Sequence, residues 1–141
     1  MSGLLTLLAC LSPAEQALEL RDLESFEDQV QPVLAARCAN PSCHGDAERP
    51  LELYALHFHR MDSAMLHRDT PLDHDELRAN ALRVLGVGVG LEPARSPALR
   101  KPLAVEAGGQ EHVGGALFGD TGAVDYRSLR SWLEDDTGGP P

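Results

Sequence analysis

Apolar residues recur at helical spacing in three stretches of the chain, and the first covers residues 12–38. Acidic residues lie ahead of its apolar stripe, as is typical of the first turns of helices. Pro32 falls inside this stretch, so we expect its last helix to begin near residues 28–31, after an earlier turn, and to deliver Cys38 at its end. The residues that share the apolar face are Phe26, Val30, Val33 and Leu34.

The other two stretches predict a helix over residues 70–86 and a C-terminal helix over residues 124–136. In the first, Thr70 can cap, Pro71 suits the first turn and Gly86 ends the helix. Its apolar face comprises Leu77, Ala81, Leu82 and Leu85. The face of the C-terminal helix comprises Tyr126, Leu129, Trp132 and Leu133.

Between these helices the pattern is irregular. Residues 39–50 are rich in turn formers and predict a loop, and residues 51–69 have no clean period. Residues 87–123 form a long Gly- and Pro-rich loop, and a loop of that length is usually functional or wraps something. The pattern therefore predicts an all-α fold with a large irregular fraction. No run approaches the about 18 apolar residues that a transmembrane helix needs.

Composition and charge narrow the class of protein. Hydrophobic residues make up 43% and charged residues 24%, which is typical of one globular domain of 141 residues. Aromatic residues make up only 4%, so a large flat apolar cofactor would supply buried surface that the core otherwise lacks. The formal net charge of −10 disfavours nucleic acid as a partner. It can attract a basic partner, although salt screens most of that attraction, and solubility is the favoured interpretation of the charge.

The first residues, "MSGLLTLLAC", fit the pattern of a lipoprotein signal in which Cys10 carries the lipid. No Lys or Arg precedes the apolar run, so an ordinary apolar N-terminal turn or a wrongly assigned start remains an alternative. We expect residues 1–22 to be an export-like or flexible segment, residues 23–136 the folded domain, and residues 137–141 a disordered tail.

The stretch "RCANPSCHGD" gathers chemistry-bearing residues. Cys38 and Cys43 are separated by four residues, and His44 follows directly. Covalent haem attachment needs two thiols to add to the haem vinyl groups and an imidazole to reach the iron, usually as C-x-x-C-H. A short disulfide with an incidental histidine is the main alternative. A zinc site is less favoured because no second cysteine pair and no histidine pair at finger spacing follows.

A six-coordinate haem needs a second axial ligand far along the chain. His112 lies between two glycine pairs in "GGQEHVGG", and glycines let the backbone approach a flat ligand closely. His59 and Met61 are competing ligands. A solvated histidine in a flexible loop is the alternative interpretation of His112.

Four stretches in order carry a resemblance to a known family: "FEDQVQPVLAARCANPSCHG", "RPLELYA", "SPALRKPLAVEAGGQEHVGG" and "DYRSLRSWLE". Together they resemble the small haem-binding domains of bacterial exported proteins in the cytochrome c superfamily. Those domains carry V-x-P-[IV]-L before the haem-binding cysteines, then H-x-G-G, and close with Y-x-x-L-x-x-W-[IL]. The chain departs from the family in its cysteine spacing, which leaves the attachment geometry open.

The resemblance implies a cytochrome c-like fold, with few helices and long irregular loops wrapped around one haem c per chain. It implies that Cys38 and Cys43 form the thioether bonds, that His44 is the proximal iron ligand and that His112 is the distal one. Candidate partners for the haem propionates are Arg60, Arg100 and Lys101, because a buried anion favours a cation beside it.

The expected function is electron transfer by a monohaem c-type cytochrome, which is a carrier and not an enzyme. We expect a periplasmic or other extracytoplasmic location, a redox partner protein with a basic docking face, and membrane contact only through a lipid at Cys10. Two alternatives stay open: a haem enzyme or sensor with an open iron site, and a haem-free exported interaction module closed by a Cys38–Cys43 disulfide.

Overall fold

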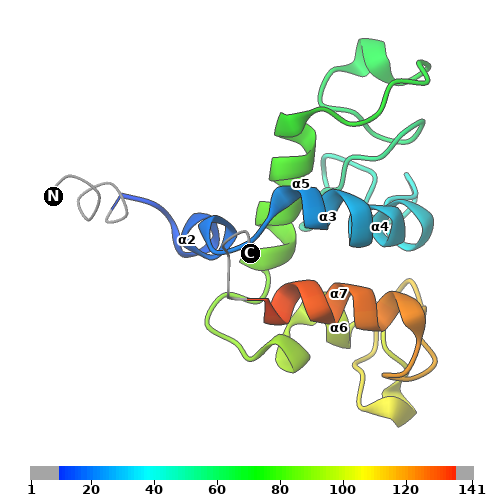
Figure 1. Cartoon of the computed structure of the whole chain (residues 1–141). Coiled ribbons are helices and arrows are strands. Elements are labelled where there is room, and N and C mark those ends of the chain that lie inside the picture. Colours follow the sequence, from blue (N-terminus) through cyan, green and yellow to red (C-terminus); the bar gives the residue numbers. More distant parts are fainter. Residues whose placement is uncertain (1–9, 136–141) are drawn as a thin grey trace, which may run out of the picture.

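The computed structural model describes residues 10–135, and its helices are joined by long irregular segments (Figure 1). The α-helices are α2 (Pro13–Glu19), α3 (Leu23–Gln29), α4 (Gln31–Arg37), α5 (His74–Gly86), α6 (Pro97–Arg100) and α7 (Val124–Glu134). Three 3₁₀ turns accompany them: η1 (Ser63–Met65), η2 (Pro93–Arg95) and η3 (Val105–Ala107). Over the described residues, β pairing is limited to isolated bridges, so the predicted all-α class is confirmed.

The predicted N-terminal helical stretch is divided into three helices, and the local sequence explains where each of them begins. Ser12 and Glu15 form a capping box at the start of α2, and Asp22 caps α3 with its carboxylate. Helix α4 begins at Gln31 with Pro32 in its first turn, as predicted. Leu18 of α2 is buried in the hydrophobic core, so α2 packs against the helices that follow residue 23.

Helix α5 begins three residues later than its first predicted turn, because Asp73 and not Thr70 is the cap. The Asp73 carboxylate accepts from the Glu76 amide, and Glu76 reaches back to the Asp73 amide. This capping box satisfies two backbone N–H groups that the helix itself leaves unpaired. The predicted end at Gly86 is confirmed. The prediction of one long loop after Gly86 is partly wrong, since α6 and two 3₁₀ turns interrupt that segment.

Helices α3 and α7 pack together at the centre of the fold. The rings of Phe26 and Trp132 lie 4.9 Å apart at 59°, and both side chains are buried. The predicted apolar face of α7 is confirmed: Tyr126, Leu129, Trp132 and Leu133 are all buried. Aromatic contacts of this kind contribute beyond the apolar area that they bury. This contact packs a helix from the N-terminal part of the chain against the C-terminal helix.

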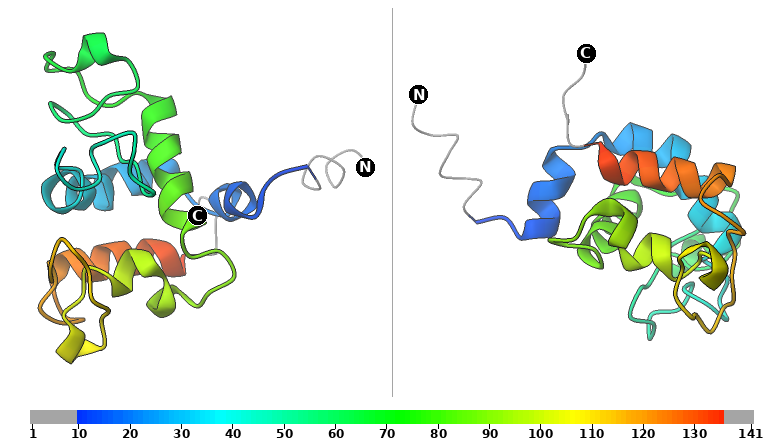
Figure 2. Two further views of the ribbon diagram at one scale, coloured as in Figure 1. Left: turned by 180° about the vertical axis from the view of Figure 1, so that it is seen from behind. Right: turned by 90° about the horizontal axis from the view of Figure 1, so that it is seen from below.

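Most of the irregular segments lie at one end of the molecule, whereas residues 87–92 lie beside α2 (Figure 1). Figures 1 and 2 show α2 at the opposite end, with α5 standing across α3 and α4. The segment after α4 and the segment before α7 both lie at the loop end, although they are far apart in sequence. Within residues 10–135, no helix is long and apolar enough to cross a membrane. The expectations for residues 1–9 and 136–141 lie outside the described part of the chain.

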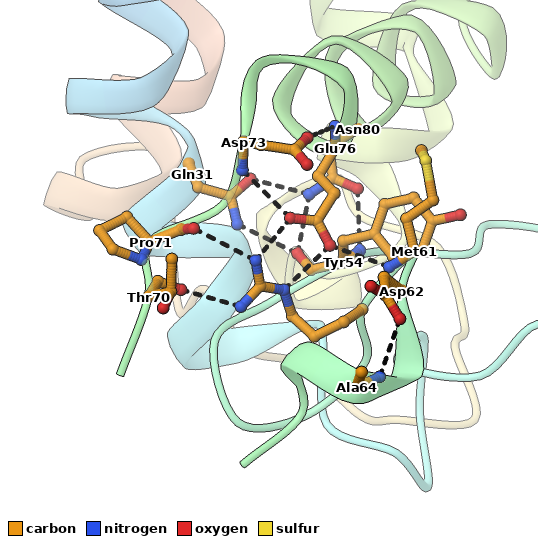
Figure 3. A network of polar contacts seen from close by, with 11 residues as sticks. Gln31, Tyr54, Met61, Asp62, Ala64, Thr70, Pro71, Asp73, Glu76 and Asn80 are labelled. Carbon is orange, nitrogen blue, oxygen red and sulfur yellow. Dashed lines mark hydrogen bonds and ion pairs between the residues drawn. The ribbon is translucent and has the colours of Figure 1, made fainter. Parts of the chain in front are cut away.

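A buried ion pair fixes the irregular segment 55–73 to α5. Arg60 donates to both oxygens of Glu76, at 2.9 and 2.7 Å, and both side chains are almost fully buried. The remaining guanidinium contacts are to the carbonyls of Thr70 and Pro71, at 2.8 and 3.2 Å (Figure 3). Burial alone would raise the pKa of Glu76, but Arg60 and two backbone N–H groups hold it below its usual range.

We expect Glu76→Gln to lower the free energy of unfolding by about 3–5 kcal/mol, because it leaves the buried Arg60 charge uncompensated. Urea unfolding followed by circular dichroism measures this. The control is Glu134→Gln, which breaks an exposed pair with Arg130 and should change stability little. Equal effects of the two substitutions would contradict the role given to the buried pair.

Candidate functional site

The thiol loop, residues 38–45, begins where α4 ends. Cys38 is the C-cap residue of α4, and its amide donates to the Leu34 carbonyl. The Asn40 side chain accepts from the Ser42 amide at 2.9 Å, and the Asn40 carbonyl accepts from the Cys43 amide at 2.8 Å. This turn absorbs the residues by which the cysteine spacing exceeds the usual motif. Both cysteines of the loop are free thiols in this structure.

His44 is held by the extended segment that follows the loop. Its Nδ1 lies 2.8 Å from the Leu51 carbonyl, and its own carbonyl accepts from the Leu53 amide at 2.7 Å. A carbonyl only accepts, so Nδ1 carries the proton and Nε2 keeps its lone pair. An imidazole held through Nδ1 in this way is arranged as a metal ligand usually is.

Gly45 is required where the thiol loop folds back on itself. A Cβ at this position would lie 2.2 Å from the Ala39 carbonyl oxygen, and its amide donates to the Asn40 carbonyl at 3.0 Å. Only glycine permits so close an approach of two backbone segments. The glycine after His44 therefore helps to set the position of the imidazole.

The glycine loop, residues 102–118, carries His112. Leu103 and Phe118 form a parallel bridge at its base, and the Phe118 ring meets Tyr126 of α7 edge-on at 5.9 Å. A Cβ at Gly109 would lie 1.8 Å from the Leu103 carbonyl oxygen, and one at Gly114 would lie 2.9 Å from the His112 ring. The glycines thus let the loop close on its own backbone and leave room for the imidazole.

The two loops bring His44 and His112 together. The ring centres lie 6.0 Å apart, and the ring planes are within 5° of parallel. A metal–imidazole bond is about 2 Å long and the ring centre lies roughly 1 Å behind the nitrogen, so one metal ion between two imidazoles places their centres roughly 6 Å apart. The separation of the ring centres and their parallel planes are compatible with two imidazoles that share one metal ion.

Burial lowers the pKa of His44, and the bond to Leu51 opposes that shift. Positive charge on His112, Arg49 and Lys101 lowers it further. The neutral form, which is the one that binds metal, is therefore favoured at neutral pH.

The thiol of Cys38 is also affected by its surroundings. Burial raises its pKa to about 11, and a negative charge on Cys43 raises it too. Because the thiolate is the species that binds zinc and exchanges disulfides, this environment favours neither reaction. Among the described residues, no group of three or more Cys, His, Asp or Glu side chains is placed to hold a metal ion. The zinc alternative thus finds no ligand set there.

A pocket of about 560 Å³ opens beside His112, within the size range of small-molecule sites. Its lining includes the apolar side chains of Leu103, Val105 and Val113 together with Gln110 and Glu111. All lining residues belong to the glycine loop, and neither cysteine nor His44 is among them. The pocket therefore supplies one apolar wall next to the parallel rings.

Two of the sequence-predicted residues have other partners. His59 Nε2 lies 2.8 Å from a Glu52 carboxylate oxygen, and its ring stacks on Tyr54 at 5.1 Å. Arg60 is buried against Glu76, so a haem propionate would have to compete with this ion pair, and the predicted pairing with a propionate stays a prediction. The ion pair itself could not be predicted, because the glutamate lies sixteen residues away. Met61 is half exposed, and its amide donates to Glu76.

The other predicted cations lie nearer the site. Lys101 is close enough to His44 to affect its pKa, and the Arg100 carbonyl accepts from the Gln110 amide at the base of the glycine loop. Arg49, which sequence reasoning missed, also acts on His44 and donates to the Ser42 carbonyl at 3.2 Å. The only sequence signal for Arg49 was its position shortly after the thiol loop.

Comparison of the chain with models of known families, with curated proteins and with solved structures found no match in any of the three.

The glycine loop yields a stability prediction. Gly109→Ala should lower the free energy of unfolding by about 1–3 kcal/mol, because the new methyl group meets backbone that cannot move aside. Gly119→Ala is the matched control, since nothing lies within 4 Å of its Cβ position. Urea denaturation of both variants measures the difference. An unchanged stability in Gly109→Ala would contradict the close approach to Leu103.

Proposed function

We propose that this protein is a monohaem c-type cytochrome that acts in electron transfer and is not an enzyme. The observation that carries the proposal is the pair of parallel imidazoles, His44 and His112, with ring centres 6.0 Å apart. One of them follows directly on the cysteine pair in the same short loop. This donor set suits haem c and suits few other groups, because thiols for attachment and opposed imidazoles for ligation are both present.

In this proposal the chain's own residues attach and orient the cofactor. Cys38 and Cys43 are the thioether positions, His44 is the proximal ligand and His112 is the distal one. The haem, when bound, supplies one-electron redox chemistry. Leu103, Val105 and Val113 would offer apolar surface to the haem on the His112 side. Lys101 and Arg49 offer positive charge near His44 for the propionates, with Arg100 as a further candidate.

A cytochrome c-like fold is part of the proposal. Its support is the order of the elements: α4 leads directly into the cysteine pair, long loops follow, and α7 packs back on α3 through Trp132 and Phe26. The sequence elements that resemble the family fall on these structural elements. The thin aromatic core is in keeping with a fold that a flat cofactor completes.

We also propose an extracytoplasmic location and a redox partner with a basic docking face. The support for location is chemical, since thioether attachment of haem in bacteria accompanies export in the family that this chain resembles. Cys10 is exposed, as a lipid attachment site must be. The net charge of −10 supports a basic partner.

Covalent attachment is tested on protein made together with cytochrome c maturation machinery. An alkaline pyridine haemochrome spectrum should report covalent haem in the wild type. In the double variant Cys38→Ala/Cys43→Ala, acidified organic solvent should extract any haem, because no thioether holds it. Cys10→Ala is the matched control and should retain its haem. Complete extraction from the wild type would refute covalent attachment, and a wild type that contains no haem at all would favour the haem-free module.

Ligation by His112 is tested separately by absorption spectroscopy of the ferric protein. His112→Ala should convert a low-spin spectrum to a high-spin one that responds to cyanide, while the haem stays attached. His59→Ala and Met61→Ala should leave the spin state unchanged, because His59 is bonded to Glu52 and Met61 is half exposed. A wild-type protein that binds cyanide or carbon monoxide as readily as His112→Ala would favour the sensor or enzyme alternative.

A further inference from the structure

The strap, residues 51–54, connects α5 to His44 through its backbone. Its odd-numbered residues hold the histidine, since the Leu51 carbonyl lies 2.8 Å from Nδ1 and the Leu53 amide donates to the His44 carbonyl. Its even-numbered residues, Glu52 and Tyr54, are bonded to α5. Alternation of this kind is what an extended segment produces, because successive residues face opposite sides.

Arg83 of α5 donates to two groups of Glu52, the backbone carbonyl and the side-chain carboxylate. One guanidinium nitrogen donates to the Glu52 backbone carbonyl at 3.1 Å, and another donates to its carboxylate at 2.7 Å. The guanidinium also lies over the Tyr54 ring, 4.8 Å from its centre. A planar group that bonds two acceptors on one residue fixes orientation as well as distance. The backbone between Leu51 and Leu53 is therefore anchored at its middle residue.

Asn80, one turn earlier on α5, holds the next even-numbered residue. Its side chain accepts from the Tyr54 amide and donates to the Tyr54 carbonyl, both at 2.8 Å. Gln31 of α4 donates to the same carbonyl at 3.1 Å, and Asn80 donates to Gln31 (Figure 3). These amide side chains are buried, so losing any of their bonds is costly.

We propose that Arg83 and Asn80 are positioning residues for His44: through the strap, they hold the Leu51 carbonyl against Nδ1 and thereby set the reduction potential of the bound haem. This inference rests on the proposed function. Neither residue touches His44. Arg83 and Asn80 act on it through Glu52 and Tyr54, which fix the backbone that makes the contacts of Leu51 and Leu53 with His44. The sequence offers no motif for this role.

The direction of the effect follows from the hydrogen bond. A carbonyl that accepts from Nδ1–H makes the other ring nitrogen a stronger donor to a metal ion. A stronger donor stabilises the oxidised, more positive iron, so weakening the Leu51 contact should raise the reduction potential. The loss of one positive charge acts in the opposite direction, because it makes gaining an electron less favourable. The sign of the shift therefore separates positioning from simple electrostatics.

The experiment compares Arg83→Met with Arg78→Met by redox titration of the haem-bearing proteins. Arg78 also lies on α5 and pairs with Glu15, so its loss removes the same charge without touching the strap. In Arg83→Met we expect the equilibrium constant for one-electron reduction to increase about tenfold, which corresponds to about 59 mV. Arg78→Met should show no rise. A fall or no change in Arg83→Met would overturn the proposal.

Arg83→Lys tests the positioning role without a change in charge. Its single ammonium keeps the charge but cannot reproduce the planar double contact with Glu52. A rise in potential is still expected, because the double contact is lost without the opposing effect of a lost charge. An unchanged potential in Arg83→Lys together with a fall in Arg83→Met would assign the whole effect to charge and would overturn the proposal.

A measurement that does not report on haem keeps this inference separate from the proposed function. Hydrogen exchange of the Leu53 amide, measured by NMR on the full chain as purified, should be faster in Arg83→Met and unchanged in Arg78→Met, because that amide bonds to His44 only while the strap is in place. Unchanged exchange in Arg83→Met would overturn the positioning role. Absence of covalent haem in the wild type would instead refute the proposed function.

Discussion

Two imidazoles from loops distant in sequence lie with their ring planes parallel and their centres 6.0 Å apart, and the hydrogen bonds and close backbone approaches of both loops hold this arrangement. His44 comes from the loop that follows α4, and His112 from the loop that precedes α7. Neither loop has a strand or a long helix to stiffen it. Each is instead fixed by its own backbone hydrogen bonds and by glycines that let chain segments approach closely.

Buried polar contacts stabilise the irregular part of the chain where aromatic packing is scarce. Arg60 and Glu76 anchor the segment before α5, and Asn80 and Gln31 anchor Tyr54. Such contacts are directional, so they specify one arrangement of a loop more strongly than apolar contacts of equal area do. They also make the loops depend on single residues, because a buried charge that loses its partner destabilises the fold.

The helices could be predicted from the sequence because their signals are local. The face of α7 repeats at helical spacing, and Pro32 and Gly86 mark helix ends. The sequence pattern also singled out His44 and His112, which the structure brings together, whereas their role as ligands stays a prediction. The start of α5 was missed because two capping candidates, Thr70 and Asp73, compete and only the second pairs with Glu76. The roles of Arg60 and Arg83 could not be predicted, since each depends on an acid far along the chain.

The central claim is that His44 and His112 ligate one iron with their ring planes parallel. Electron paramagnetic resonance of the frozen ferric protein tests it most directly, because the splitting of the signal in low-spin haem depends on the angle between the axial imidazole planes. The 5° angle between the rings predicts a rhombic low-spin spectrum with three well-separated g values. A high-spin spectrum, or the single large g value that perpendicular planes produce, would contradict this account of the site.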